Sequence, residues 1–179
     1  MVSRLFNMEV TNASMYDGST AFAEALLMAK RIRPEGKIIL VSEGLFSEVR
    51  EVAETYLEDY DFKLQTIPAD KKTGAVSISD LKNLIQQQGV FAVAVQTPNA
   101  FGIIEDLRAI QSEFKTGPDS PLFLVHTGDP VSFGLIAPPG DAGADIVTAE
   151  GQPLGVYPAF GGPSVGLFST KKEFLRSMP

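Results

Sequence analysis

A cluster of small polar residues precedes a helical run near the start of the chain. Residues 14–20 read Ser-Met-Tyr-Asp-Gly-Ser-Thr, and an alanine- and leucine-rich segment follows directly. The first backbone N–H groups of a helix lack intrahelical partners, and the helix dipole adds positive charge there. Such a start can bind an anion, above all a phosphate group. The same residue types also cap helices without any ligand, so both interpretations stand. The candidate residues of this cradle are Ser14, Tyr16, Asp17, Gly18, Ser19 and Thr20.

Three further polar residues are candidates for the same cleft. Asn99 lies in Gln-Thr-Pro-Asn-Ala-Phe-Gly, residues 96–102, which either directs polar groups into a cleft or only joins a strand to a helix. Asp129 precedes a proline, and its carboxylate either faces a protonated ring nitrogen or forms an ordinary Asp-Pro turn. Gln152 lies in a glycine-rich arch, residues 151–163, whose apolar residues favour a packing role over a flexible loop.

Other kinds of catalytic centre have little support in the sequence. His126 is the single histidine. A lone histidine near the end of a strand is more often a structural hydrogen bonder than a catalyst. The chain has no Gly-x-Gly-x-x-Gly motif and no Walker lysine pattern. It has no cysteine, and its carboxylates are scattered, so we expect no thiol chemistry and no metal site.

Composition limits the class of protein and of partner. The chain has 179 residues, 44% of them hydrophobic, which suits one globular domain spanning residues 1–179. A net charge of -7 argues against nucleic acid as a partner, because no basic stripe could neutralise phosphates. No apolar run reaches the roughly 18 residues that a membrane span needs. The absence of cysteine fits a cytoplasmic protein.

These side chains must be positioned by an alternation of strands and helices. Apolar runs and period-two patterns predict strands over 8–12, 37–42, 62–67, 90–96, 122–125, 145–148 and 165–169. Helical spacing predicts helices over 20–31, after a cap at Ser47, from Ser79 or Asp80, over 103–114 and over 171–178. This order predicts an α/β fold, with a mostly parallel sheet covered by helices on both faces.

The topology also predicts where a site must lie. Open α/β sheets bind ligands beyond the carboxyl ends of their strands. The segments that follow the predicted strands are 14–20, 42–46, 96–102, 126–132 and 150–155. The candidate residues named above belong to these segments.

Eight segments together resemble one family, the first subunit of two-subunit glycine decarboxylase P-proteins of the glycine cleavage system. Among them are Asn-Ala-Ser-Met-Tyr-Asp-Gly-Ser-Thr-Ala and Gln-Thr-Pro-Asn-Ala-Phe-Gly-Ile-Ile-Glu-Asp. The segments are 12–21, 41–43, 96–106, 129–134, 138–140, 143–146, 151–155 and 160–163. The family's subunit is much longer, so the chain is expected to be its large domain.

The resemblance implies the fold of type I pyridoxal-phosphate (PLP) enzymes. The large domain of these enzymes is a three-layer α/β/α unit with a seven-stranded sheet, mostly parallel, in which 165–169 would be the antiparallel strand. PLP chemistry needs a Schiff-base lysine, an acid facing the pyridine nitrogen and a phosphate cradle. Residues 14–20 offer the cradle and Asp129 the acid. The lysine is absent, because Gln152 or Pro153 stands at its expected position, and Lys171 and Lys172 come too late in the topology.

The resemblance therefore implies a lysine-free subunit that completes the site of a partner. PLP would be attached to P-protein subunit 2, and the pair would decarboxylate glycine and pass the aminomethyl group to the lipoylated H-protein. The chain by itself is expected to be inactive. Two alternatives stand beside this interpretation: another type I PLP aminotransferase or decarboxylase with an unusual lysine, and a domain that only docks.

Overall fold

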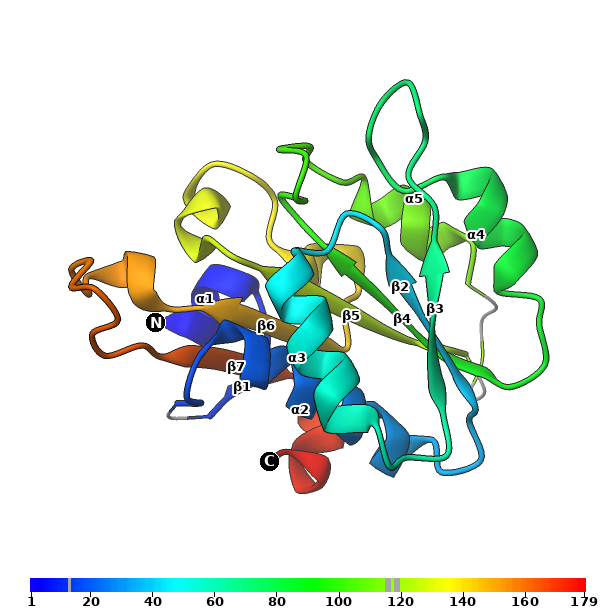
Figure 1. Ribbon diagram of the computed structural model, residues 1–179, viewed down its shortest axis with the longest axis horizontal. Helices are drawn as coiled ribbons and strands as arrows, with labels where there is room; N and C mark the ends of the chain where they lie inside the picture. The colour runs from blue at the N-terminus through cyan, green and yellow to red at the C-terminus, as the bar shows by residue number, and fades with distance from the viewer. Residues whose placement is uncertain (13, 115–116, 118–119) are drawn as a thin grey trace.

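The described part of the chain contains one seven-stranded sheet. The computed structural model describes residues 1–12, 14–114, 117 and 120–179. The strand order across the sheet is β1-β7-β6-β5-β4-β2-β3 (Figure 1). The strands are β1 (Val10–Thr11), β2 (Ile38–Ser42), β3 (Lys63–Ile67), β4 (Val90–Gln96), β5 (Leu122–Thr127), β6 (Ile146–Glu150) and β7 (Gly166–Thr170).

One strand of this sheet runs against the others. The pairs β2–β3, β2–β4, β4–β5 and β5–β6 are parallel. β7 is antiparallel to β6 on one side and to β1 on the other, so β1 points the same way as the parallel strands. The predicted mostly parallel sheet with its antiparallel strand at 165–169 is therefore confirmed, shifted by one residue.

Helices cover both faces of the sheet and produce three layers. Neighbouring residues of a strand point to opposite faces, so Ile39 and Leu40 of β2 enter different apolar cores. One core packs under α2 (Gly18–Ile32) and α3 (Ser47–Leu57), and Figure 1 shows α3 lying across the front of the sheet. The other core packs under α1 (Val2–Phe6), α4 (Ile78–Leu84) and α5 (Leu107–Ser112).

The alanines of α2 explain its close seat on the sheet. Ala21, Ala25 and Ala29 are almost completely buried, as are the larger Phe22 and Leu26. Small side chains let the helix axis approach the strands, while the larger ones fill the space between them. α2 therefore begins close to the end of β6, which is where the candidate site lies.

Several element boundaries differ from the predicted ones. The expected helix at 103–114 is α5 alone, because Asp106 caps it with its side chain on the N–H of Ala109. α3 begins at Ser47 itself, and Phe46 is its N-cap residue without a side-chain cap bond, so the expected cap at Ser47 is wrong. The last predicted helix is the 3-10 segment η4 (Lys172–Ser177). The Gly/Pro-rich region before β6 contains η1 (Pro130–Gly134) and η2 (Pro139–Ala142).

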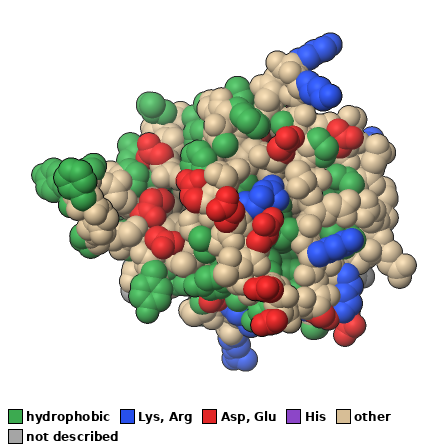
Figure 2. Space-filling model, viewed as in Figure 1, with side chains coloured by type: hydrophobic (Ala, Val, Ile, Leu, Met, Phe, Trp, Pro, Cys, Tyr) green, Lys and Arg blue, Asp and Glu red, His purple; other side chains and the backbone are tan. Residues whose placement is uncertain are grey.

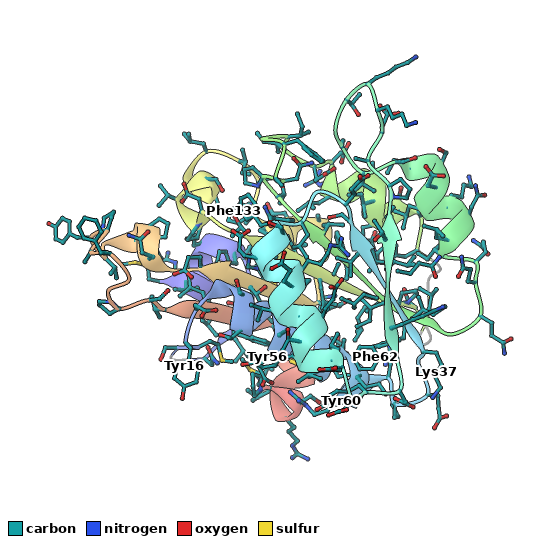
Figure 3. The ribbon with its side chains drawn as sticks, in the orientation of Figure 1. Tyr16, Lys37, Tyr56, Tyr60, Phe62 and Phe133 are labelled. Carbon is teal, nitrogen blue, oxygen red and sulfur yellow. The ribbon has the colours of Figure 1, made fainter. Side chains whose placement is uncertain are left out.

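The amino ends of β2 and β3 carry an ion-pair cluster. Asp61 lies 2.9 Å from the Nζ of Lys30, and it also pairs with Lys37. The side-chain hydrogen bond from Lys37, followed by that from Lys30, lowers the pKa of Asp61 to about 2. Figure 3 shows Lys37 beside Tyr60 and Phe62 at this end of the sheet. Across the described residues, no helix has the length and apolar character needed to cross a membrane.

Candidate functional site

A cavity of about 280 Å³ opens at the carboxyl edge of the sheet, where the start of α2 meets the ends of β5 and β6. Ligands of open α/β sheets bind at this edge. Four of the five segments predicted to carry a site contribute to its wall, and the fifth, 96–102, does not. The lining residues are Gly18, Ser19, Phe46, Glu48, Val49, His126, Gly128 and Glu150.

Asp17 caps the start of α2 with a reciprocal pair of hydrogen bonds. The backbone N–H of Thr20 donates to Asp17 Oδ1 at 2.7 Å, and the backbone N–H of Asp17 donates to Thr20 Oγ1 at 3.3 Å. This capping box satisfies two groups that would otherwise lack partners. Asp17, the acidic residue of the predicted cradle, is therefore the cap of α2.

Glu150 supplies a second carboxylate to the same helix start. Its Oε2 accepts a hydrogen bond from the backbone N–H of Gly18 at 2.9 Å. Its Oε1 accepts bonds from the backbone N–H of Gln152 at 2.9 Å and from the hydroxyl of Ser164 at 2.8 Å. One side chain therefore ties the α2 start to both ends of the segment between β6 and β7.

Gly18 is the residue that allows this close contact. A Cβ atom built on Gly18 would lie 2.8 Å from the backbone N and 2.9 Å from the Cα of Glu150. Side-chain carbons do not approach backbone atoms so closely, so the position requires glycine. The end of β6 therefore packs directly against the first turn of α2.

His126 lines the cavity from the end of β5 and is buried. Its Nδ1 lies 2.9 Å from the hydroxyl oxygen of Thr148 on β6, and its ring packs edge-on against Phe22 at 5.5 Å between centroids. Burial lowers the pKa of His126 to about 3. The ring is therefore neutral at physiological pH, and its contacts are those of the structural hydrogen bonder that the sequence favoured.

Asn99 lies outside the cavity and organises the loop after β4. Its side-chain amide donates to the carbonyl oxygen of Gly74 at 2.8 Å and to Glu105 Oε1 at 2.7 Å. Its side-chain oxygen accepts from the N–H groups of Phe101 and Ile103, both at 3.0 Å. Burial raises the pKa of Glu105, against the opposing effect of its hydrogen bonds. All the bonding capacity of Asn99 is thus used within the chain.

The remaining candidate residues are spread around this edge. Tyr16 is 86% exposed, and Figure 3 shows it at the margin of the molecule, pointing away from the sheet. Ser14 is exposed as well. Asp129 is exposed and caps η1 by accepting a bond from the N–H of Val131 at 3.0 Å. Gln152 begins η3 (Gln152–Leu154), and its side-chain amide donates to the carbonyl oxygen of Val156.

The first lysine after β7 lies at the other edge of the sheet. Lys171 follows β7, which runs antiparallel, and so it stands beside the start of β6. Its Nζ pairs with Asp145 and donates to the carbonyl oxygen of Gly143 at 3.1 Å. Among the described residues that line the cavity at the carboxyl edge, none is a lysine.

The sequence predicted a site at this edge, and the predicted segment 150–155 includes Glu150, but no motif singled that residue out. Glu150 gave no motif signal, because its significance depends on the contact between β6 and α2, which lie far apart in the chain. No motif singled out Phe46 either; its backbone N–H is held by the side-chain oxygen of Gln96 at 3.0 Å. Across the parts of the chain that the structure describes, no three His, Asp or Glu residues are grouped as metal ligands.

The chain matches one known protein family over its whole length. The family model for the glycine cleavage system P-protein matches residues 1–179. The chain is 41% identical to a probable glycine dehydrogenase (decarboxylating) subunit 1 of Aquifex aeolicus and 44% identical to that of Thermotoga maritima. All of this chain is aligned in both cases, but it spans only 40% and 38% of those relatives.

A solved structure supports the fold as well as the sequence likeness. It is a crystal structure of glycine decarboxylase (P-protein) of the glycine cleavage system in an inhibitor-bound form. The TM-score is 0.88 at 40% identity, with 100% of this chain and 38% of that chain covered. The fold class predicted from the sequence is therefore confirmed.

Proposed function

The chain belongs to the glycine cleavage system P-protein family, and we propose that it is the large domain of a glycine dehydrogenase (decarboxylating) subunit 1. In this proposal residues 1–179 form one domain of a longer subunit that works with P-protein subunit 2. The pair releases CO₂ from glycine and transfers the remaining aminomethyl group to the lipoyl arm of H-protein. The cytoplasm is the proposed compartment.

In this proposal PLP is bound by subunit 2. PLP, when bound, withdraws electrons from the glycine carbon that loses CO₂. This chain contributes polar groups at the carboxyl edge of its sheet, with Ser14, Tyr16, Asp17 and Gln152 proposed to face the shared cleft. Asn99 is not among them, because its side chain is buried and fully bonded within the chain. Tyr16 is 86% exposed, which suits a residue that faces a neighbouring subunit.

One observation carries the proposal: the family model matches the full chain, yet none of the described residues that line the cavity at the carboxyl edge is a lysine. A subunit of this kind can shape a site, but it offers no amine there for covalent attachment of PLP. The ion pair of Lys171 at the opposite edge supports the same assignment of roles.

A reconstitution experiment tests this function. Subunit 1 containing this chain, and subunit 2, are assayed separately and together for CO₂ release from carboxyl-labelled glycine with lipoylated H-protein. We expect turnover only when both subunits are present. Tyr16→Phe and Asp17→Asn, tested in the complex, report whether the α2 start takes part. Full activity of subunit 2 alone would contradict the proposal that this subunit completes the site.

A second candidate, a domain that only docks, has its own observation. The segment between β6 and β7 projects from the body of the protein, and it forms the green knob at the left of Figure 2. Leu154 is 47% exposed, Tyr157 is 87% exposed and Phe160 is fully exposed, so the packing role expected for this arch is not met within the chain. Normal turnover in a complex that carries both α2 variants would favour docking alone.

A further inference from the structure

The start of α2 combines the features of a phosphate cradle with an anion that is already present. Gly18 and Ser19 open the helix, and the cavity of about 280 Å³ lies against them. The N–H of Gly18, which a bound phosphate would need, instead donates to the carboxylate of Glu150 at 2.9 Å. The PLP expected from the fold resemblance therefore does not fit this chain's own cleft.

Three observations describe this misfit. The Gly18 N–H is used, and the backbone of Glu150 is so close that a Cβ on Gly18 would be 2.8 Å from it. The histidine that lines the cavity is neutral and hydrogen-bonded to Thr148. The wall also has no lysine among the described residues. A phosphate placed at the start of α2 would compete with two carboxylates that already accept bonds from this helix end, those of Glu150 and Asp17, and like charges repel.

We propose that Glu150 is a built-in anion that fills the phosphate position at the start of α2 and closes this cradle to phosphate-bearing ligands. A carboxylate is favoured there for the same reason as a phosphate, since both carry negative charge to the positive end of the helix dipole. Glu150 holds this position firmly because its other oxygen is fixed by Gln152 and Ser164. The helix start thus keeps the shape of a phosphate cradle, but the carboxylate of Glu150 occupies it.

The proposal predicts that removing the carboxylate opens an anion site. Inorganic phosphate is titrated into the isotopically labelled protein, and the backbone amide signals of Gly18, Ser19 and Thr20 are followed by NMR. We expect no saturable shift in the wild type. In Glu150→Ala we expect saturable shifts at these amides and phosphate binding at least about tenfold tighter than in the wild type, because one repelling charge is lost and one N–H is freed.

Two control variants separate this effect from general loss of negative charge. Glu48→Gln removes a carboxylate from the wall of the same cavity without touching the α2 start. Ser164→Ala removes one hydrogen bond to Glu150 but leaves the carboxylate in place. Both should behave like the wild type. Equal gains in Glu48→Gln would overturn the proposal, because simple charge reduction would then explain the binding.

Glu150→Gln keeps the size of the side chain and removes its charge. It tests the proposal if Glu150→Ala does not fold. We expect weaker but detectable phosphate shifts at Gly18 and Ser19 in this variant. Saturable phosphate binding at these amides in the wild type, or none in a folded Glu150 variant, would overturn the proposal. Phosphate binding is independent of glycine turnover, so failure here is distinguishable from failure of the proposed function.

Discussion

Glu150 at the end of β6 accepts a hydrogen bond from the backbone N–H of Gly18 at 2.9 Å, which joins the sheet to the first turn of α2. The contact connects two segments that are 132 positions apart in the chain. It explains why a glycine stands at the helix start and why a helix that could bind an anion carries a protein carboxylate instead.

Gly18→Ala should destabilise the chain by about 1–3 kcal/mol, because the added methyl group would press against backbone atoms that cannot move aside. The free energy of unfolding in urea measures this. Gly134→Ala is the matched control, since a Cβ there meets nothing within 4 Å, and it should change stability by less than about 0.5 kcal/mol. Equal stability of both variants would show that β6 and α2 are not in close contact.

His126 should make the stability of the chain depend on pH. The pKa of His126 is about 3 in the folded chain and 6.5 for a solvent-exposed histidine, so below pH 6.5 the unfolded state binds a proton that the folded state does not. Stability therefore falls as the pH is lowered from 6.5 towards 3. The contribution of His126 at pH 5 should be about 2 kcal/mol less favourable than at pH 8.

Urea unfolding of the wild type and of His126→Gln at both pH values isolates this contribution. His126 is the single histidine, and the carboxylates, including Glu105, are common to both proteins and cancel in the difference. The stability difference between the two proteins should shift by about 2 kcal/mol between pH 5 and pH 8. A difference that is constant over this range would contradict the burial of a neutral ring.

Asn99→Ala should cost about 2–4 kcal/mol of unfolding free energy, because Glu105 Oε1 and the N–H groups of Phe101 and Ile103 each lose their bond to the Asn99 side chain. Thermal or urea unfolding measures the loss. Asn99→Asp should also destabilise, since it places a second carboxyl group beside Glu105. Adding Glu105→Gln to it should recover part of that loss. Wild-type stability of Asn99→Ala would contradict a structural role.

The exposed segment between β6 and β7 should contribute to the association with subunit 2 and contribute little to folding stability. Tyr157→Ser and Phe160→Ser should leave the unfolding free energy within about 0.5 kcal/mol of the wild type, since both rings are exposed. Affinity for subunit 2 should fall at least about tenfold, because exposed aromatic side chains are common interface anchors. Tyr56→Ser, on α3 (Figure 3), is the control and should leave the affinity unchanged.

Strands were the part of the fold most accessible from sequence. The apolar run of β4 gave its boundaries directly, and the patterns of β2 and β3 placed them within one residue. α1 was not predicted, because five residues carry too little periodicity to distinguish a helix. α5 is shorter than the apolar spacing of 103–114 suggests, since Asp106 sets its start through a side-chain bond.

The site was accessible only as a region. The rule that ligands bind at the carboxyl edge selected segments that do meet there, including the residues around Gly18 and His126. The internal bonds of Asn99 and the cap formed by Asp129 depend on three-dimensional contacts that a single sequence does not contain. Glu150 was not singled out for the same reason, since its partner lies at the other end of the chain.

Reductive trapping tests the central claim most directly. The complex of subunit 1 and subunit 2 is loaded with PLP and reduced with borohydride, and the peptides are examined by mass spectrometry for pyridoxyl-lysine. Lys171→Arg in this chain, which retains the charge opposite Asp145, serves as a control and should leave the result unchanged. The account predicts a stoichiometric pyridoxyl-lysine on subunit 2 and none on residues 1–179. A stoichiometric pyridoxyl-lysine within this chain would contradict it.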